Sequence, residues 1–224
     1  MLRRDSGRVD FRTAFLNRLI VRSGKQAFAL TRQCAPPLLE EVYNLEDALI
    51  CAQYLAAFVR RADVVKVACI AQIVNVIAPI LTRTTGLLIQ SIYYPFLRFS
   101  QHAQGKSLAC VIDSPTYKAG DRGEAPALDA CATLGENGDV AVFAINRSTV
   151  EQVTVKIQLE NRRATSILMA ETLGGDDPKA ANTWEKPDRV RPRAAMAALT
   201  SEGHVEVTLS KTAFGIVRVR TVER

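Results

Sequence analysis

The spacing of apolar residues changes along the chain, from helical in the first half to alternating in the second. After Pro36-Pro37, apolar side chains recur at steps of three and four residues, at Leu38, Val42, Leu45, Leu49, Ala52, Ala56 and Val59. This period predicts one apolar face of a helix whose first turn tolerates the prolines. Acidic Glu40 near the start and basic Arg60 near the end interact favourably with the helix dipole and therefore support a helix here.

A β-branched run follows this helix. Val64–Ala71 shows little alternation of apolar and polar residues, which is typical of a strand buried on both faces of a parallel sheet. A second helical pattern lies around Ile89–His102. The pattern of residues 35–103 therefore predicts the order helix, strand, loop and helix. This order is typical of the end of an α/β repeat, and it contains too few strands to form a complete sheet.

An all-β pattern begins after Ser107. Val153–Leu159 and Val205–Leu209 alternate apolar and polar residues, which predicts two half-buried strands. Val140–Ile145 predicts a more buried strand, and Ile216–Val219 lies in the last one. A long irregular loop is expected between about residues 174 and 192, where glycine, aspartate and proline gather.

The alternation also predicts which side chains face the core. We expect Val155, Ile157, Val207 and Leu209 to point inward, and Arg218 and Arg220 to face out. Strands at this spacing, without helices between them, predict an antiparallel β-sandwich of jelly-roll type over residues 105–224.

Composition narrows the function classes. The chain has 224 residues, of which 48% are hydrophobic, and this suffices for a sizeable core. It contains no apolar run long enough to span a membrane and no clear signal peptide, so we expect a cytoplasmic protein. Its five cysteines include no CxxC pair, so we expect a reducing compartment, with no disulfide scaffold, metal site or cofactor.

The net charge of +6 does not indicate a nucleic-acid-binding protein. The eight basic residues among the first 33 outnumber two acidic ones, and the rest of the chain is neutral. A protein that binds phosphate backbones carries its charge on the folded body. We therefore expect no nucleic-acid partner, and we separate a basic head, residues 1–34, from residues 35–104 and the sandwich, residues 105–224.

Four stretches resemble family 51 α-L-arabinofuranosidases, in one order over about residues 35–222. They are Ala35–Leu49, Ala62–Ile80, Ile92–Phe96 with Asp113–Tyr117, and Asp177–Val190. The resemblance implies a (β/α)8 barrel followed by a β-sandwich, with residues 35–104 as helix 7, strand 8 and helix 8 of the barrel. It also implies a retaining glycosidase that releases terminal α-L-arabinofuranosyl groups from arabinan, arabinoxylan and related oligosaccharides, without a cofactor. The resemblance further implies that full-length relatives are homo-oligomers, often hexamers.

The resemblance assigns one site residue, Gln72, as a hydrogen-bonding contact to the arabinose of the glycone subsite. Its place at the end of the predicted strand agrees with where barrel enzymes gather their chemistry. The family's nucleophile belongs to an Asp-Glu-Trp-Asn motif, which would fall near Phe15, but Thr13–Val21 contains no carboxylate. The acid/base glutamate would precede Met1. We therefore expect no catalytic residue in this chain and no activity from it alone.

Other residues of chemical interest have structural interpretations. Glu40, Glu41, Glu46 and Asp47 lie on the predicted helix as caps or solvated positions. His102 and His204 lack nucleophile partners, and we interpret both as structural or surface residues. Trp184 and Tyr117 could stack on a sugar, but we favour packing in a loop or in the core as their role. The alternative functions are a stand-alone sandwich that binds carbohydrate or mediates assembly, and a regulatory or structural fragment without a ligand.

Overall fold

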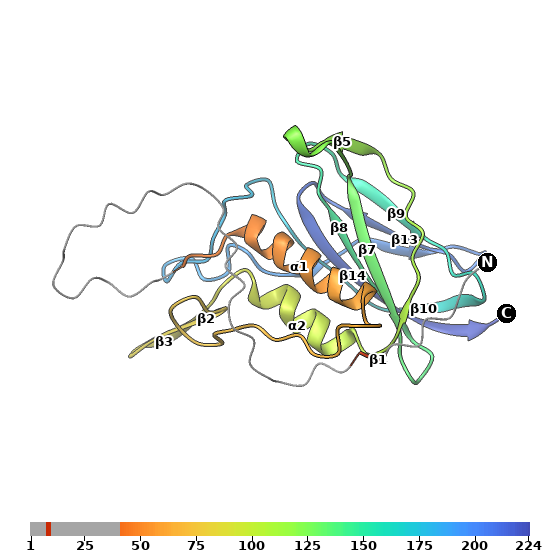
Figure 1. Ribbon diagram of the computed structural model, residues 1–224, viewed down its shortest axis with the longest axis horizontal. Coiled ribbons are helices and arrows are strands. Elements are labelled where there is room, and N and C mark those ends of the chain that lie inside the picture. The colour runs from red at the N-terminus through yellow and green to blue at the C-terminus, as the bar shows by residue number, and fades with distance from the viewer. Residues whose placement is uncertain (1–7, 10–40) are drawn as a thin grey trace.

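The computed structural model describes residues 8–9 and 41–224, and these residues fold into a large and a small antiparallel β-sheet with helices against them (Figure 1). The expectations for the head, for Pro36-Pro37 and for Glu40 lie outside the described residues, apart from residues 8–9. The larger sheet has the order β1 (Arg8–Val9), β4 (Gly105–Leu108), β7 (Leu128–Leu134), β8 (Val140–Asn146), β14 (Ala213–Glu223), β10 (Arg162–Gly174) and β11 (Arg193–Ala194).

The smaller elements complete the described fold. A second sheet has the order β12 (Ala197–Leu199), β13 (Val205–Leu209) and β9 (Val153–Ile157). Two separate hairpins are β2 (Ile80–Arg83) with β3 (Gly86–Ile89), and β5 (Thr116–Lys118) with β6 (Glu124–Pro126). The α-helices are α1 (Leu45–Arg60) and α2 (Tyr93–His102), and a short 3-10 turn is η1 (Gly120–Arg122).

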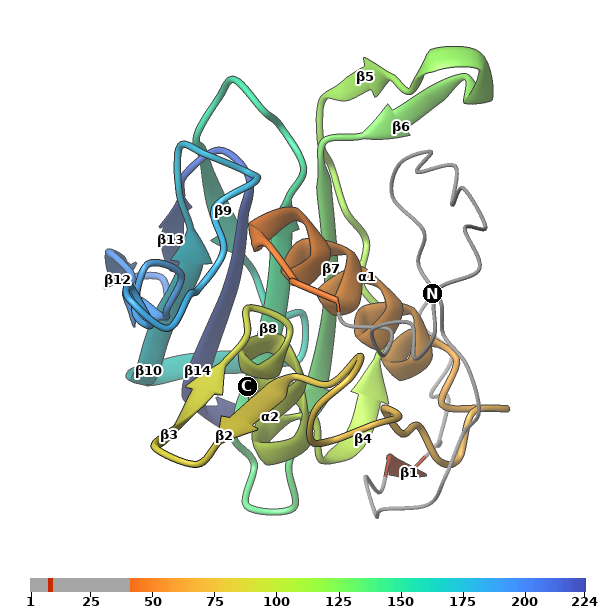
Figure 2. The same ribbon diagram turned by 90° about the vertical axis from the view of Figure 1, so that its left-hand side faces the viewer.

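The large sheet is covered on both faces. Figure 2 shows α1 and α2 on one side of it and the β12-β13-β9 sheet on the other. Side chains of β8 alternate between these layers: Phe143 and Ile145 pack with the helices, while Val142 and Ala144 pack with the small sheet. All seven residues of β8 are therefore buried, as its near-continuous apolar sequence predicts.

Packing between the two sheets requires one glycine. Gly215 of β14 faces Leu209 of β13, and a Cβ atom at this glycine would lie 2.4 Å from the Leu209 Cδ2 atom. Val155, Val207 and Leu209 are buried in this layer, and Ile157 is half-buried against it. The prediction of an antiparallel sandwich with these four side chains inward is confirmed.

The helix predicted after Pro36-Pro37 begins later than expected, at Leu45. Asn44 caps it: its side chain accepts a hydrogen bond from the Asp47 N–H at 3.1 Å, and the Asp47 carboxylate accepts from the Asn44 N–H at 2.9 Å. Such a reciprocal box satisfies two N–H groups that the first turn leaves open. Residues 41–43 therefore lie outside the helix, and the predicted start is wrong.

The second predicted helix also starts too early, because Ile89 belongs to β3 and α2 begins at Tyr93. The predicted strand Val64–Ala71 is not formed in this chain: these residues form a turn and irregular backbone outside every described sheet. Val64 is 63% exposed and Val67 43% exposed. A strand requires at least one neighbouring strand to pair its backbone groups, and none of the described strands lies beside this run.

Arg218 and Arg220, expected at the surface, hold the buried Asp139. The Arg218 Nη2 atom lies 2.8 Å from Asp139 Oδ2, and the Arg220 Nε atom lies 3.3 Å from Oδ1. Asp139 is only 4% exposed. Burial would raise its pKa, but the hydrogen bonds and charges of both guanidinium groups outweigh this and lower it. These pairs fasten the turn after β7 to β14.

Candidate functional site

The surface around Gln72 is the candidate site. The loop that carries it follows α1 and leads into β2, and the Gln72 side chain is exposed. Three contacts tie this loop to its surroundings through Asn75: the Asn75 N–H donates to the Ile80 carbonyl at 2.8 Å, and the Asn75 side chain exchanges hydrogen bonds of 2.7 and 2.9 Å with Thr82. The loop is thereby fastened along β2.

A buried glutamine holds the other end of the loop. Gln90 is 1% exposed, and its amide group donates to the carbonyls of Ala78 at 2.7 Å and Glu41 at 3.1 Å. Its amide oxygen accepts from the Tyr43 N–H at 2.9 Å. The Tyr43 hydroxyl donates to the Ile77 carbonyl at 2.9 Å. A satisfied buried amide of this kind fixes both segments that it joins.

Asn182 extends this network into the sandwich loop. It is 2% exposed, donates to the carbonyls of Ile89 and Val190 at 2.9 Å, and accepts from the Val190 N–H at 2.7 Å. Ser91, fully buried, donates to the Asn44 carbonyl. We call Tyr43, Asn44, Gln90, Ser91 and Asn182 the polar joint. It links the start of α1, the Gln72 loop, the β2–β3 hairpin and the long loop after β10.

Burial affects one titratable group of the polar joint. It raises the pKa of the Tyr43 hydroxyl to about 12, with smaller contributions from the negative charges of Glu41 and Asp47. Tyr43 is therefore a neutral hydrogen-bond donor across the physiological range. This is a structural role.

Beside the polar joint, two turns bring a cation onto an aromatic ring. The Arg83 guanidinium carbon lies 4.1 Å from the centroid of the Trp184 ring. Arg83 ends β2, whereas Trp184 belongs to the long loop about a hundred residues later. Sequence reasoning considered Trp184 but missed Arg83, Asn75 and Thr82, because no local pattern shows which residues of the hairpin meet the distant loop.

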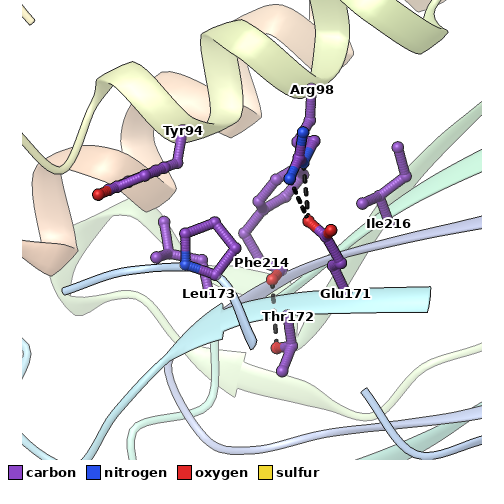
Figure 3. Close-up of a pocket in the computed structure, with 8 residues that line it drawn as sticks. Tyr94, Arg98, Glu171, Thr172, Leu173, Phe214 and Ile216 are labelled. Atoms are coloured by element: carbon purple, nitrogen blue, oxygen red, sulfur yellow. Dashed lines mark hydrogen bonds and ion pairs between the residues drawn. The ribbon is translucent and has the colours of Figure 1, made fainter. Parts of the chain in front are cut away.

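A small pocket lies between α2 and the large sheet (Figure 3). The Arg98 Nε atom donates to Glu171 Oε2 at 2.7 Å across its opening. Leu173, Phe214 and Ile216 supply apolar walls. Its cavity volume of about 10 Å³ is far below the 300–1,000 Å³ usual for ligand sites, and the ion pair occupies its polar groups. We interpret it as a packing defect between layers.

The carboxylates considered from sequence have structural partners. Asp47 belongs to the capping box, and Glu46 forms an ion pair with Lys179 of the long loop. The Glu41 carbonyl accepts from Gln90. Burial is the largest influence on Asp47 and raises its pKa, while its bond to Asn44 acts in the opposite direction. These positions agree with the interpretation as caps and solvated groups.

The two histidines lie in different elements. His102 ends α2, where burial and the charges of Arg218 and Arg98 lower its pKa. His204 is 8% exposed in the turn before β13, and its Nδ1 atom lies 3.2 Å from Glu202. Within residues 8–9 and 41–224, no three His, Cys, Asp or Glu side chains gather as a metal site would require. In the same residues, no helix is both long and apolar enough to cross a membrane.

The fold places the chain among the C-terminal regions of glycosidases. A family 51 α-L-arabinofuranosidase from Bifidobacterium longum superposes with a TM-score of 0.75 at 31% identity, over 83% of this chain and 37% of that one. The family 51 enzyme from Xanthomonas axonopodis pv. citri superposes with a TM-score of 0.74 at 26% identity, over 81% and 37% of the two chains.

The sequence comparisons give the family. The model of the family described as the α-L-arabinofuranosidase C-terminal domain matches residues 20–212. The chain belongs to this family, and the resemblance inferred from the four stretches is confirmed. The match begins within the basic head, before Ala35.

Curated relatives carry arabinofuranosidase names. The intracellular exo-α-(1→5)-L-arabinofuranosidase of Streptomyces lividans is 36% identical over 185 residues, which are 82% of this chain and 28% of that protein. The exo-α-(1→6)-L-arabinofuranosidase of Bifidobacterium longum is 36% identical over 190 residues, 83% and 36% of the two. The chain thus spans about a third of the length of these relatives.

Proposed function

We propose that this chain is the C-terminal region of a retaining exo-α-L-arabinofuranosidase, acting on arabinan, arabinoxylan and arabino-oligosaccharides in the cytoplasm. The chain-long match to the family, together with relatives named for this activity, carries the proposal. The names of several relatives as intracellular enzymes support the compartment. Assembly into homo-oligomers belongs to the same proposal.

The proposed role of residues 35–104 is to complete a (β/α)8 barrel, with Val64–Ala71 as its eighth strand, ahead of a jelly-roll-type sandwich. The exposed β-branched side chains Val64 and Val67 support this, because they are suited to a sheet that other residues complete. The polar joint then holds the barrel end against the sandwich. Gln72 is proposed to donate or accept a hydrogen bond with the arabinose, at the C-terminal end of that strand.

The chemistry requires groups that this sequence does not supply at matching positions. Retaining hydrolysis uses two carboxylates about 5–5.5 Å apart, one as acid/base and one as nucleophile. The sequence contains no Asp-Glu-Trp-Asn motif, and an amide such as Gln72 cannot serve as nucleophile or base. Losing acid/base catalysis alone costs about 10²–10⁴ in rate. The chain alone should release no 4-nitrophenol from 4-nitrophenyl α-L-arabinofuranoside above a buffer blank.

A chimera tests the proposed function directly. Residues 41–224 of this chain would replace the matching region of the Streptomyces lividans relative, and hydrolysis of α-(1→5)-L-arabinotriose would be measured. We expect the chimera to be active. A folded but inactive chimera would contradict the proposal.

Gln72 has its own test in the chimera. Gln72→Ala should lower kcat/KM about tenfold to a hundredfold, because it removes a hydrogen bond to substrate in a desolvated site. The matched control is Gln53→Ala, on α1, where the side chain donates to the Leu49 carbonyl. Equal activity of the two variants would remove Gln72 from the site.

A stand-alone carbohydrate-binding module is the second candidate, and the structure gives it little support. Such modules present several aromatic side chains on one face. Among the described residues, the aromatic side chains that are large and well exposed are Tyr54, on α1, and Tyr117, on the β5–β6 hairpin, which belong to different elements.

A further inference from the structure

The tip of the β2–β3 hairpin meets the turn Thr183–Lys186 of the long loop. At this meeting point the Arg83 guanidinium lies over the Trp184 ring at 4.1 Å. The ring also rests beside the hairpin backbone, since a Cβ atom on Gly86 would lie 3.8 Å from its Cζ3 atom. Arg83 is exposed and Trp184 is half-buried. The pair is therefore open to solvent from the arginine side.

The turn that carries Trp184 is closed by two backbone hydrogen bonds. The Thr183 N–H donates to the Lys186 carbonyl at 3.2 Å, and the Lys186 N–H donates back at 3.1 Å. Asn182, at the start of this turn, is anchored in the polar joint. Trp184 and Glu185 thus occupy the two central positions of a turn that both ends hold in place.

Arg83 keeps its donors available. Within the described chain it stacks on Trp184 instead of forming an ion pair. The neighbouring Glu185 carboxylate accepts hydrogen bonds from its own backbone N–H and from the Thr183 hydroxyl. These bonds, together with the positive charge of Arg83, lower the pKa of Glu185. A stacked guanidinium retains in-plane N–H groups that match two adjacent oxygen atoms. The arrangement suits vicinal hydroxyl groups.

β2, the strand that ends in Arg83, is joined to the Gln72 loop by direct contacts. Asn75, three residues after Gln72, bonds to the backbone and hydroxyl of Thr82, the neighbour of Arg83 in β2. Val74 also forms a β-bridge with Ile80 at the start of β2. β2 is therefore an element that the Gln72 loop contacts directly.

We infer that Arg83 and Trp184 form a subsite for the arabinofuranosyl units adjacent to the arabinose at Gln72, the aglycone side of an α-(1→5)-linked arabino-oligosaccharide. This inference rests on the proposed function. Arg83 donates hydrogen bonds to two sugar hydroxyls, and the part of the half-buried Trp184 ring that remains accessible contacts the C–H groups of the sugar. Sites of this composition, an aromatic surface with a few placed polar groups, are typical of small-ligand recognition.

Tryptophan fluorescence of the chain reports on this site specifically, because Trp184 is its one tryptophan. The 224-residue chain would be titrated with α-(1→5)-L-arabinotriose to about 20 mM while tryptophan emission is recorded. We expect a saturable change with a Kd on the order of 1 mM, as suits a small open site. Xylotriose serves as the comparison sugar and should bind at least about fivefold more weakly.

Variants separate the subsite from general binding. Arg83→Ala should weaken arabinotriose binding about tenfold, and Arg83→Lys, which keeps the charge but loses the planar fork, by a smaller factor. The matched control is Arg191→Ala, on the same loop, where the exposed guanidinium lies 3.9 Å from Asp188; its binding should be unchanged. Circular dichroism confirms that each variant is folded.

Three results would overturn the subsite: no emission change with arabinotriose, an equal response to xylotriose, or equal binding by the Arg83→Ala and Arg191→Ala variants. The first result is expected if this surface is suited to contact another region of a longer protein and has no affinity for a sugar. An active chimera combined with any of these results would reject the subsite and leave the proposed function standing. An inactive chimera with specific arabinotriose binding would reject the proposed function and leave only a sugar-binding surface at Arg83 and Trp184.

Discussion

β8 and residues 64–71 have similar sequences and different structures. Val140–Asn146 forms a central strand, paired with β7 on one side and β14 on the other, and all its residues are buried. Val64–Ala71 is equally rich in β-branched and small apolar residues, but it is irregular, and most of it is half-buried or exposed. Apolar composition therefore favours a strand without being sufficient. The neighbouring strands decide, because they pair the backbone groups and cover both faces.

The largest expected effect is in the buried strand. Phe143 is fully buried and stacks on Phe99 of α2, with ring centroids 4.1 Å apart. Phe143→Ala should lower the free energy of unfolding by about 3–5 kcal/mol, because it removes a large apolar side chain and leaves a cavity. Urea unfolding measures this.

Val67→Ala is the matched change in the irregular run, where the side chain is 43% exposed. It should alter stability by less than about 0.5 kcal/mol. If the two substitutions cost the same, residues 64–71 are packed in solution and the contrast between the regions is wrong.

The next effect concerns the polar joint, which connects the two regions. Gln90→Leu preserves the approximate size of the side chain but leaves the Tyr43 N–H and the Ala78 carbonyl without their partner. The expected loss is about 2–3 kcal/mol, since each buried unsatisfied group costs about 1–3 kcal/mol. The measurement is thermal and urea unfolding. Gln104→Leu, at an exposed glutamine after α2, is the control and should be close to neutral.

A smaller and pH-dependent effect is expected at Asp139. Its folded-state pKa is lowered by Arg220 and Arg218 despite burial, so the unfolded chain takes up the proton first on acidification. The contribution to stability is complete above the unfolded pKa, about 3.9, and is lost as the pH falls through the lower folded pKa.

Asp139→Asn tests this assignment. It should cost about 1.5–3 kcal/mol at neutral pH, the range for hydrogen bonds to charged groups, and should flatten the stability profile below about pH 4. Equilibrium unfolding at several pH values measures both. An unchanged acid profile in the variant would show that other carboxylates control that range.

Much of the sandwich could be predicted from sequence, because alternation identifies the strands β9 and β13 and their inward faces. The long strand β10 could not be, since residues such as Ser166 and Glu171 break its pattern; the register shifts within β10 also interrupt any regular period. The helix boundaries were displaced for a similar reason: Asn44 caps α1 through a local side-chain bond that periodicity does not show.

The candidate site was less predictable. Gln72 followed from the family resemblance, and its contact with arabinose stays a prediction. Arg83 had no signal in the sequence, because its partner Trp184 lies in a distant loop that Asn182 positions. Contacts of that kind depend on tertiary packing.

Amide hydrogen exchange in the dilute chain tests the central contrast most directly. Residues Val140–Asn146 should exchange only through global unfolding, as central strands do, whereas Lys66–Ala68 should exchange at rates close to those of an unstructured peptide. In the active chimera, where the rest of a sheet is supplied, the amides of Lys66–Ala68 should become strongly protected. Protection of Lys66–Ala68 in the 224-residue chain equal to that of β8 would contradict the account.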